Sequence, residues 1–478
     1  MSEEIVQDVF CCYVDFPMNG FKAIDINLLL TSGRLMHVMF VNIPLGTENI
    51  DLLRLMLGCR GLKSVTLVNT GIPPRHSRKV TKQLEKFLTS SAASSLEQLH
   101  TSIPFDLRVL RGCTYLHNLK LHFVPRQPLS DILIVENFEK KPNECLRVFT
   151  ICRAHVANFM RYGDLADILA YCPKLETFGN IEVFSILSKM SDSKLLLPPY
   201  QLRKCFLNRN SPPVRNLNPS HDYVEDMEDI ENQDEKRDVS IVASACPNLE
   251  ELHVQMSQEH FSDIFSRLSL FENLNLLEIE SVHFQSRFHS ELNYLTELGS
   301  RLRHLAIYGI NCVNLYSVLT FCPKLESLRV DNDGTFLTWE SFPNDFENLK
   351  RLSCTNLNAC GHYNLITLFL KCPNLEELFL KDATFFDDHF VSVIRENEAL
   401  KKIKMCFIFN STISENWIEV LVDNFNDLEK LALTTSVMPD EETIEAVANA
   451  ADVSVDIFES YNDVLFMEFF ERKKPYCE

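Results

Sequence analysis

The stretch Cys372-Pro373-Asn374-Leu375-Glu376-Glu377-Leu378-Phe379-Leu380 contains the pattern L-x-x-L-x-L, beginning at its first leucine. Close variants of its opening stand at residues 172–176, 246–252 and 322–328. The pattern is typical of leucine-rich repeats, in which each repeat contributes one short strand and buries its apolar face only by stacking on its neighbours. This repeat decides the fold of the chain.

The same pattern predicts strands along most of the sequence, beginning with Leu35-x-x-Val38-x-Phe40. The first leucines of the later repeats are Leu62, Leu96, Leu116, Leu146, Leu175, Leu202, Leu249, Leu274, Leu302, Leu325, Leu349, Leu375, Leu400 and Leu428. Most intervals lie in or near the roughly 20–29 residues of this repeat class. Residues 34–457 are therefore predicted to form a solenoid of about 15 repeats, with a last irregular strand at 453–457.

The segments between the predicted strands have helical spacing, for example Leu365, Leu368 and Phe369. We expect full helices there rather than short 3₁₀ turns. The predicted fold class is α/β, a leucine-rich-repeat solenoid shaped as a right-handed curved horseshoe. Its parallel sheet would line the concave face and its helices the convex face.

Three segments depart from the repeat. Residues 1–33 are expected to form an N-terminal cap, in which 9–16 are either a strand or a short buried helix. Residues 458–478 are expected to form a C-terminal tail that caps the last repeat, or alternatively closes over the concave groove. Residues 211–238 form an acidic insertion, predicted to be a solvated loop or a docking site for a basic partner or a modifying enzyme.

The net charge of −20 argues against nucleic acid and against an anionic membrane surface as partners, and favours basic protein segments. No apolar run approaches the ~18 residues of a membrane span, and the acidic start does not resemble a secretory signal. The sequence thus predicts a cytoplasmic or nuclear location. The 16 cysteines are then expected to be reduced thiols rather than a disulfide framework.

Cysteine stands three residues before the first strand leucine in several repeats, namely at Cys59, Cys113, Cys172, Cys246, Cys322 and Cys372. Phenylalanine takes this place in other repeats, at Phe271, Phe346 and Phe425, where it could not replace a metal ligand or a nucleophile. The pattern indicates buried packing thiols. Catalytic motifs such as H-E-x-x-H, G-x-S-x-G and the glycine-rich phosphate loops are absent. We therefore expect no enzyme, no metal site and no cofactor.

Residues that alternate with the strand leucines are predicted to face the concave groove, because side chains of a strand alternate between its two faces. Tyr308, Arg329 and Phe379 are of the types that anchor protein partners, and a ladder of basic residues would contact acidic parts of the ligand. The predicted partner-binding residues are His253, Tyr308, Arg329, Arg351, Phe379, Lys381, Lys402, Lys404 and Lys430. The alternative is a solvated face whose charges pair across strands.

The Cys-Pro-[Asn/Lys]-Leu-Glu repeat resembles the cysteine-containing repeats of the F-box/leucine-rich-repeat family, over residues 35 to about 457. That resemblance implies a substrate receptor or adaptor of an SCF-type (cullin–RING) ubiquitin ligase, with the target in the groove and Skp1 and a cullin as further partners. Residues 1–33 lack a recognisable F-box and would be a degenerate adaptor-binding segment. The alternative is a stand-alone interaction or inhibitor scaffold.

Overall fold

A computed structural model describes the chain at residues 10–13, 36–41, 61–68, 74–133 (without 124 and 126), 141–151, 162–192, 199–208, 239–256, 267–281, 295–310, 313–331 (without 314), 345–355, 368–369, 371–382, 392, 395, 400–409, 416–434 and 453–458. The chain divides into two compact units, and each is described by itself. Unit 1 comprises residues 1–252 and 270–273, and unit 2 comprises 253–269 and 274–478.

In unit 1, consecutive strands pair in parallel in chain order. They are β1 (Phe10–Tyr13), β2 (His37–Val41), β3 (Ser64–Val68), β4 (Gln98–Thr101), β5 (Asn118–Leu121), β6 (Val148–Ile151), β7 (Thr177–Glu182) and β8 (Lys204–Asn208). Segment 9–16 is thus a strand at 10–13, one of the two forms expected. The connections contain α3 (Pro74–Leu88), η2 (Ser91–Ala93), η3 (Leu107–Gly112), η4 (Leu129–Leu133), α4 (Tyr162–Tyr171) and α5 (Phe184–Asp192).

The chain passes from unit 1 to unit 2 within β9 (Glu251–Met256). Unit 2 continues with the parallel strands β10 (Leu276–Ser281), β11 (His304–Tyr308), β12 (Ser327–Asp331), β13 (Arg351–Thr355), β14 (Glu377–Lys381), β15 (Met405–Phe409), β16 (Lys430–Thr434) and β17 (Ser454–Phe458). Its connections contain η8 (Leu268–Leu270), α8 (Leu295–Leu298), α9 (Leu315–Phe321), η10 (Leu400–Lys402) and α12 (Asn416–Asn424).

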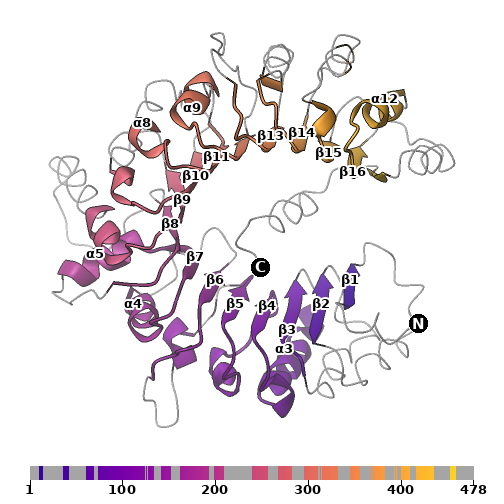
Figure 1. Cartoon of the computed structure of the whole chain (residues 1–478). Helices are drawn as coiled ribbons and strands as arrows, with labels where there is room; N and C mark the ends of the chain where they lie inside the picture. The colour runs from indigo at the N-terminus through magenta and orange to yellow at the C-terminus, as the bar shows by residue number, and fades with distance from the viewer. Residues whose placement is uncertain are drawn as a thin grey trace, which may run out of the picture. The chain divides into compact units, whose positions relative to one another are not determined.

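Within each unit the strands line the inner side of an arc and the labelled helices lie on its outer side (Figure 1). The α/β leucine-rich-repeat solenoid is thereby confirmed, with short strands joined in parallel by outer segments. The expectation of full helices throughout is wrong, because η3, η4, η8 and η10 are 3₁₀ helices. A 3₁₀ turn rises more steeply per residue than an α-helix, so it spans a connection too short for full helical turns.

The core lies between the strands and the outer segments. In β12 the residues Leu328 and Val330 are 0% and 2% exposed, whereas Ser327, Arg329 and Asp331 alternate with them and face the other way. We call this second side of the strands, opposite the core, the inner face. The repeat leucines thus build the core as predicted, and the intervening residues lie on the inner face.

The Cys-Pro motif forms the tight turn that leads into the strand of its repeat. In the repeat at 372–380 the N–H of Leu375 donates to the carbonyl of Cys372, and Leu249 and Leu325 make the same bond to Cys246 and Cys322. Proline suits the second position of such a turn because its φ is already fixed near the required value. The five described cysteines of this register are 0–6% exposed and lie in the core.

Asparagine in the same motif ties one repeat to the preceding one. The side-chain amide of Asn348 donates to the Pro323 carbonyl at 2.9 Å, and that of Asn374 donates to the Glu347 carbonyl at 2.9 Å. Asn273 makes an equivalent bond to the Pro247 carbonyl. Each acceptor stands two residues before the first leucine of its own repeat. The asparagine therefore satisfies a backbone carbonyl that no strand reaches.

Several expected segments lie outside the described residues. These are the acidic insertion 211–238, the tail from 459 onward, and all of 1–33 except 10–13. Of the described helices, none is both long enough and apolar enough to cross a membrane.

Candidate functional site

The inner face of unit 2 holds a cluster of charged and aromatic side chains on five neighbouring strands. We call it the polar cluster; it consists of His253, Glu278, Glu280, Tyr308, Arg329, Asp331 and Thr355. Each residue alternates with core residues of its strand, so the positions follow from the two-residue period of strands β9 to β13. The register places Glu280 beside Tyr308, Tyr308 beside Asp331, and Asp331 beside Thr355.

His253 bridges two carboxylates at one end of the cluster. Its Nε2 lies 3.2 Å from Oε2 of Glu280, and its Nδ1 lies 3.6 Å from Oε2 of Glu278. The hydrogen bond from His253 holds the pKa of the Glu280 carboxyl below its usual value, although burial opposes this shift. Glu278 is only 9% exposed. The histidine therefore links the two glutamates through its two ring nitrogens.

Arg329 and Tyr308 form the centre of the cluster. The Arg329 guanidinium carbon lies 4.7 Å from the centroid of the Tyr308 ring, within the range of a cation–π contact. Its Nη2 is 4.0 Å from Oδ2 of Asp331, and the Thr355 hydroxyl donates a hydrogen bond to the other carboxylate oxygen, Oδ1. Burial, and then the charge of Glu278, raise the pKa of the Tyr308 hydroxyl above its usual range. Tyr308 is thus a neutral phenol at neutral pH.

Three carboxylates therefore surround one guanidinium and one imidazole. The side chain of Arg329 is 12% exposed and that of Glu280 is 38% exposed, so the cluster is partly desolvated while its acidic end remains open to solvent. In such surroundings an added cation is attracted more strongly than at an open surface, since screening by water is weaker. The arrangement suits the binding of a basic or hydrogen-bonding group.

Three predicted site residues thus meet in one place, namely His253, Tyr308 and Arg329. Arg351, Lys381 and Lys430 also lie on strand positions of the inner face, on β13, β14 and β16. Arg351 pairs across strands with Glu377, at 3.7 Å between Nε and Oε1. These three residues are half-buried.

The expected placement of Lys402 and Lys404 on the inner face is wrong. Lys402 belongs to η10 and Lys404 precedes β15, which begins at Met405. The N–H of Ile403 donates to the carbonyl of Leu400, so Leu400 takes the place that Cys372 has in its repeat. The pattern at this repeat is Ile403-x-x-Cys406-x-Ile408, three residues later than predicted. The two lysines instead contact Glu376, Asn374 and the Pro373 carbonyl at the edge where the strands begin.

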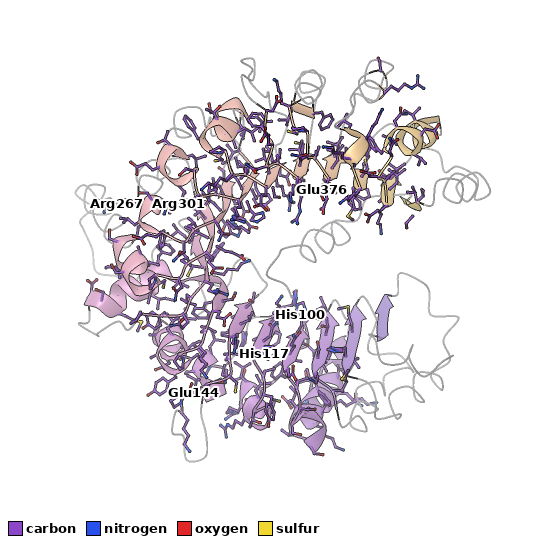
Figure 2. The ribbon with its side chains drawn as sticks, in the orientation of Figure 1. His100, His117, Glu144, Arg267, Arg301 and Glu376 are labelled. Atoms are coloured by element: carbon purple, nitrogen blue, oxygen red, sulfur yellow. The ribbon has the colours of Figure 1, made fainter. Side chains whose placement is uncertain are left out.

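That edge carries a ladder of opposite charges at the position just before each strand. In unit 1 the pairs are Lys63–Glu97, Arg147–Glu176 and Arg203–Glu250, and in unit 2 they are Arg303–Glu326 and Lys404–Glu376, all at 3.0–3.3 Å. Figure 2 shows Glu376 on the strand side of unit 2. A polar cleft in this part of unit 2 is lined by Glu326, Glu347, Asn348, Lys350, Asn374, Glu376, Lys402, Lys404 and Asp427. Exposed pairs of this kind contribute about 0–1 kcal/mol each, so they favour the correct register more than they stabilise the fold.

Phe379 occupies the inner face as predicted, but it is not an exposed anchor. It is 3% exposed and packs with Phe407, Phe409 and Ala432, which are 6%, 4% and 0% exposed, with Met405 at their side. We call these five residues the aromatic patch. Its members on β15, Met405, Phe407 and Phe409, were not predicted to lie on the inner face, because the repeat was placed three residues too early. Leu400 matches the cysteine register of the correct repeat, but the apolar pattern of the sequence fits both registers.

The buried cysteines have no reactive character. Burial raises the pKa of the Cys113, Cys172 and Cys322 thiols to about 12, so the thiolate is absent at neutral pH. Among the described residues, no three histidine, cysteine or acidic side chains are grouped so that they could hold a metal ion.

No protein-family model matches the chain, and no curated protein matches it. The chain resembles several solved structures. One is a TLR13 complex with ssRNA13, at 14% identity and a TM-score of 0.38, covering 84% of this chain and 66% of that one. A second is internalin C2 from Listeria monocytogenes, at 16% identity and a TM-score of 0.27, covering 47% and 84%. A third is the Rad7 and Elc1 complex of yeast, at 14% and 0.28, covering 63% and 87%.

The match with TLR13 thus spans just under two thirds of that protein's chain. The expectation that this chain has no nucleic-acid partner stays a prediction. The present chain is a leucine-rich-repeat protein on the strength of its own repeated sequence and its strand pairing.

Proposed function

We propose that this chain is a non-catalytic protein-recognition module that binds its partner on the inner face of unit 2. The observation that supports this most is the contact of Arg329 with Tyr308 among three carboxylates, on strand positions that the core does not need. Arginine and tyrosine are enriched at the energetically dominant positions of protein interfaces. A partner is then recognised by a few partly desolvated polar groups rather than by an apolar surface.

The chemistry of the polar cluster favours a partner segment with lysine or arginine. Glu278, Glu280 and Asp331 carry more negative charge than Arg329 neutralises, and the whole chain has a net charge of −20. An acidic face on an acidic protein attracts basic segments and repels acidic ones, which raises the association rate and selects among partners.

A finer proposal is that the chain acts as a substrate receptor or adaptor of an SCF-type ubiquitin ligase. What supports it is the Cys-Pro-[Asn/Lys]-Leu-Glu repeat, which resembles the repeats of F-box/leucine-rich-repeat proteins. In this proposal a degenerate segment at residues 1–33 contacts Skp1, and the protein is cytoplasmic or nuclear. The alternative is a stand-alone leucine-rich-repeat scaffold or inhibitor, which uses the same face and has no link to ubiquitin.

Affinity purification of the tagged full-length chain from cells separates these proposals. Recovery of Skp1 and a cullin supports the ligase proposal, and their absence under mild conditions excludes it and favours the scaffold. The recognition proposal is tested by comparing the wild-type chain with an Arg329→Ala variant and with a control variant. The control is Lys324→Ala, because the Lys324 side chain is exposed and lies outside the polar cluster. Loss of the same bound proteins from Arg329→Ala alone supports recognition by the polar cluster. Equal recovery from all three chains argues against it.

A further inference from the structure

The aromatic patch is buried although it lies on the inner face, the side of the sheet opposite the core. Phe379, Phe407 and Phe409 belong to β14 and β15, and they alternate there with the core residues Leu378, Leu380, Cys406 and Ile408. The phenylalanine rings lie close together, with 5.5 Å between the centroids of Phe379 and Phe409 and 6.5 Å between those of Phe379 and Phe407. Strands β14 and β15 therefore have apolar side chains on both faces.

Polar residues of the same face are buried too. Ser353 is 1% exposed, Thr355 is 3% exposed and Thr434 is 4% exposed, on the flanking strands β13 and β16. Neighbouring strands can enclose the sides of such residues, but they cannot cover the outward end of a side chain that stands perpendicular to the sheet. Burial that extends over four consecutive strands requires a covering layer, as in a sheet that packs on both faces.

The sequence after the last described strand has the composition of such a layer. Strand β17 pairs with β16 and ends at Phe458, so the chain leaves the sheet next to the patch. Residues 461–470 read Tyr-Asn-Asp-Val-Leu-Phe-Met-Glu-Phe-Phe, with seven apolar or aromatic side chains in ten positions. Left in water, that run would be a large exposed apolar segment, which soluble chains avoid.

We propose that residues 459–470 pack across the inner face of β14–β16 and cover the aromatic patch. Strands lie about 4.8 Å apart, so the patch extends over roughly 15 Å from β17. Twelve residues reach about 18 Å as a helix and about 40 Å when extended. The length of the segment is therefore sufficient in either conformation. This inference is independent of the proposed function, because it concerns only contacts within unit 2.

The charges that follow the segment agree with this direction. Arg472, Lys473 and Lys474 come directly after it. A chain that crosses from β17 toward β13 brings these three cations toward Asp331 on β12, the carboxylate of the polar cluster that lies nearest to this side. The inner face thus has an apolar patch next to an acidic cluster. The tail has an apolar segment followed by basic residues, so the two are complementary.

Site-specific photo-crosslinking in the full-length chain tests the placement. Benzoylphenylalanine at position 466 or 469 is expected to crosslink within the same chain to peptides that contain residues 377–381 or 405–409. Incorporation at position 476, beyond the proposed contact, is the matched control and is expected to give no such product. Crosslinks confined to 454–458 would instead mean that the tail caps the edge of the last strand, and crosslinks between two chains would mean that a second copy covers the patch. Either result overturns the proposal.

Hydroxyl-radical footprinting supplies a second test that needs no incorporated residue. In the wild-type chain Phe407 and Phe409 are expected to react slowly, because they are 6% and 4% exposed. The triple variant Phe466→Ser/Phe469→Ser/Phe470→Ser is expected to raise their oxidation several-fold, whereas Tyr476→Ser leaves it unchanged. Unchanged oxidation in the triple variant, with circular dichroism like that of the wild type, contradicts the proposal.

Discussion

The guanidinium of Arg329 lies over the ring of Tyr308, with 4.7 Å between its central carbon and the ring centroid, across the neighbouring strands β12 and β11. A partly desolvated cation–π contact contributes about 0.5–2 kcal/mol. We expect Arg329→Ala and Tyr308→Ala to be non-additive by that amount. A double-mutant cycle of urea unfolding measures this coupling. Strict additivity would mean that the two side chains are neighbours without an energetic contact.

Phe379 is expected to act through stability rather than through direct contact with a partner, because it is 3% exposed. Replacing a buried phenylalanine by alanine costs about 3–5 kcal/mol, whereas a similar-sized apolar side chain costs much less. Denaturant unfolding of Phe379→Ala and Phe379→Leu checks this. If Phe379→Ala unfolded like the wild type but lost its partner, the ring would be an exposed anchor after all.

The asparagine bond between repeats predicts a small, position-specific effect. Asn348→Ala removes the hydrogen bond to the Pro323 carbonyl, and we expect a loss of about 0.5–1 kcal/mol in the free energy of unfolding. Lys324→Ala is the matched control, because Lys324 occupies the same repeat position and its side chain is exposed. Equal effects from both substitutions would assign the loss to the turn rather than to the bond.

His100 predicts a pH dependence in unit 1. It lies on the strand layer of that unit (Figure 2), and its Nε2 contacts Nε2 of His122. Burial first, and then the charges of His122 and Lys120, lower the pKa of His100 to about 3. In the unfolded chain a histidine has a pKa of about 6.5. Between these values the unfolded state binds more protons, so the free energy of unfolding falls as the pH falls.

Between pH 7.5 and pH 5 this contribution decreases by about 2 kcal/mol. Urea unfolding at both pH values is expected to show a smaller decrease for His100→Gln than for the wild type. Parallel decreases in the two proteins would mean that His100 titrates in the folded chain as it does in the unfolded one.

The sequence by itself was enough to identify the solenoid and nearly every strand. Each first leucine, from Leu62 to Leu375, stands two residues before an observed strand, since one strand per repeat must bury the same positions. The cysteine register was correctly attributed to packing for a similar reason. Phenylalanine replaces cysteine there in other repeats, which a core tolerates and a reactive site does not. The local periodicity of the sequence is sufficient to predict the strand positions and the packing role of the cysteines, without knowledge of long-range contacts.

Only the tertiary structure decided the repeat at Leu400 and the environment of Phe379. Two registers satisfy the apolar pattern there, Leu400-x-x-Ile403-x-Met405 and Ile403-x-x-Cys406-x-Ile408, and a shift of three residues exchanges the two faces of the strand. Pairing of Leu378 with Cys406 and of Phe379 with Phe407 selects the second register. Strand alternation places Phe379 on the inner face, but its burial depends on what packs over that face. The spacing of residues within one strand contains no information about which other part of the chain packs over that strand.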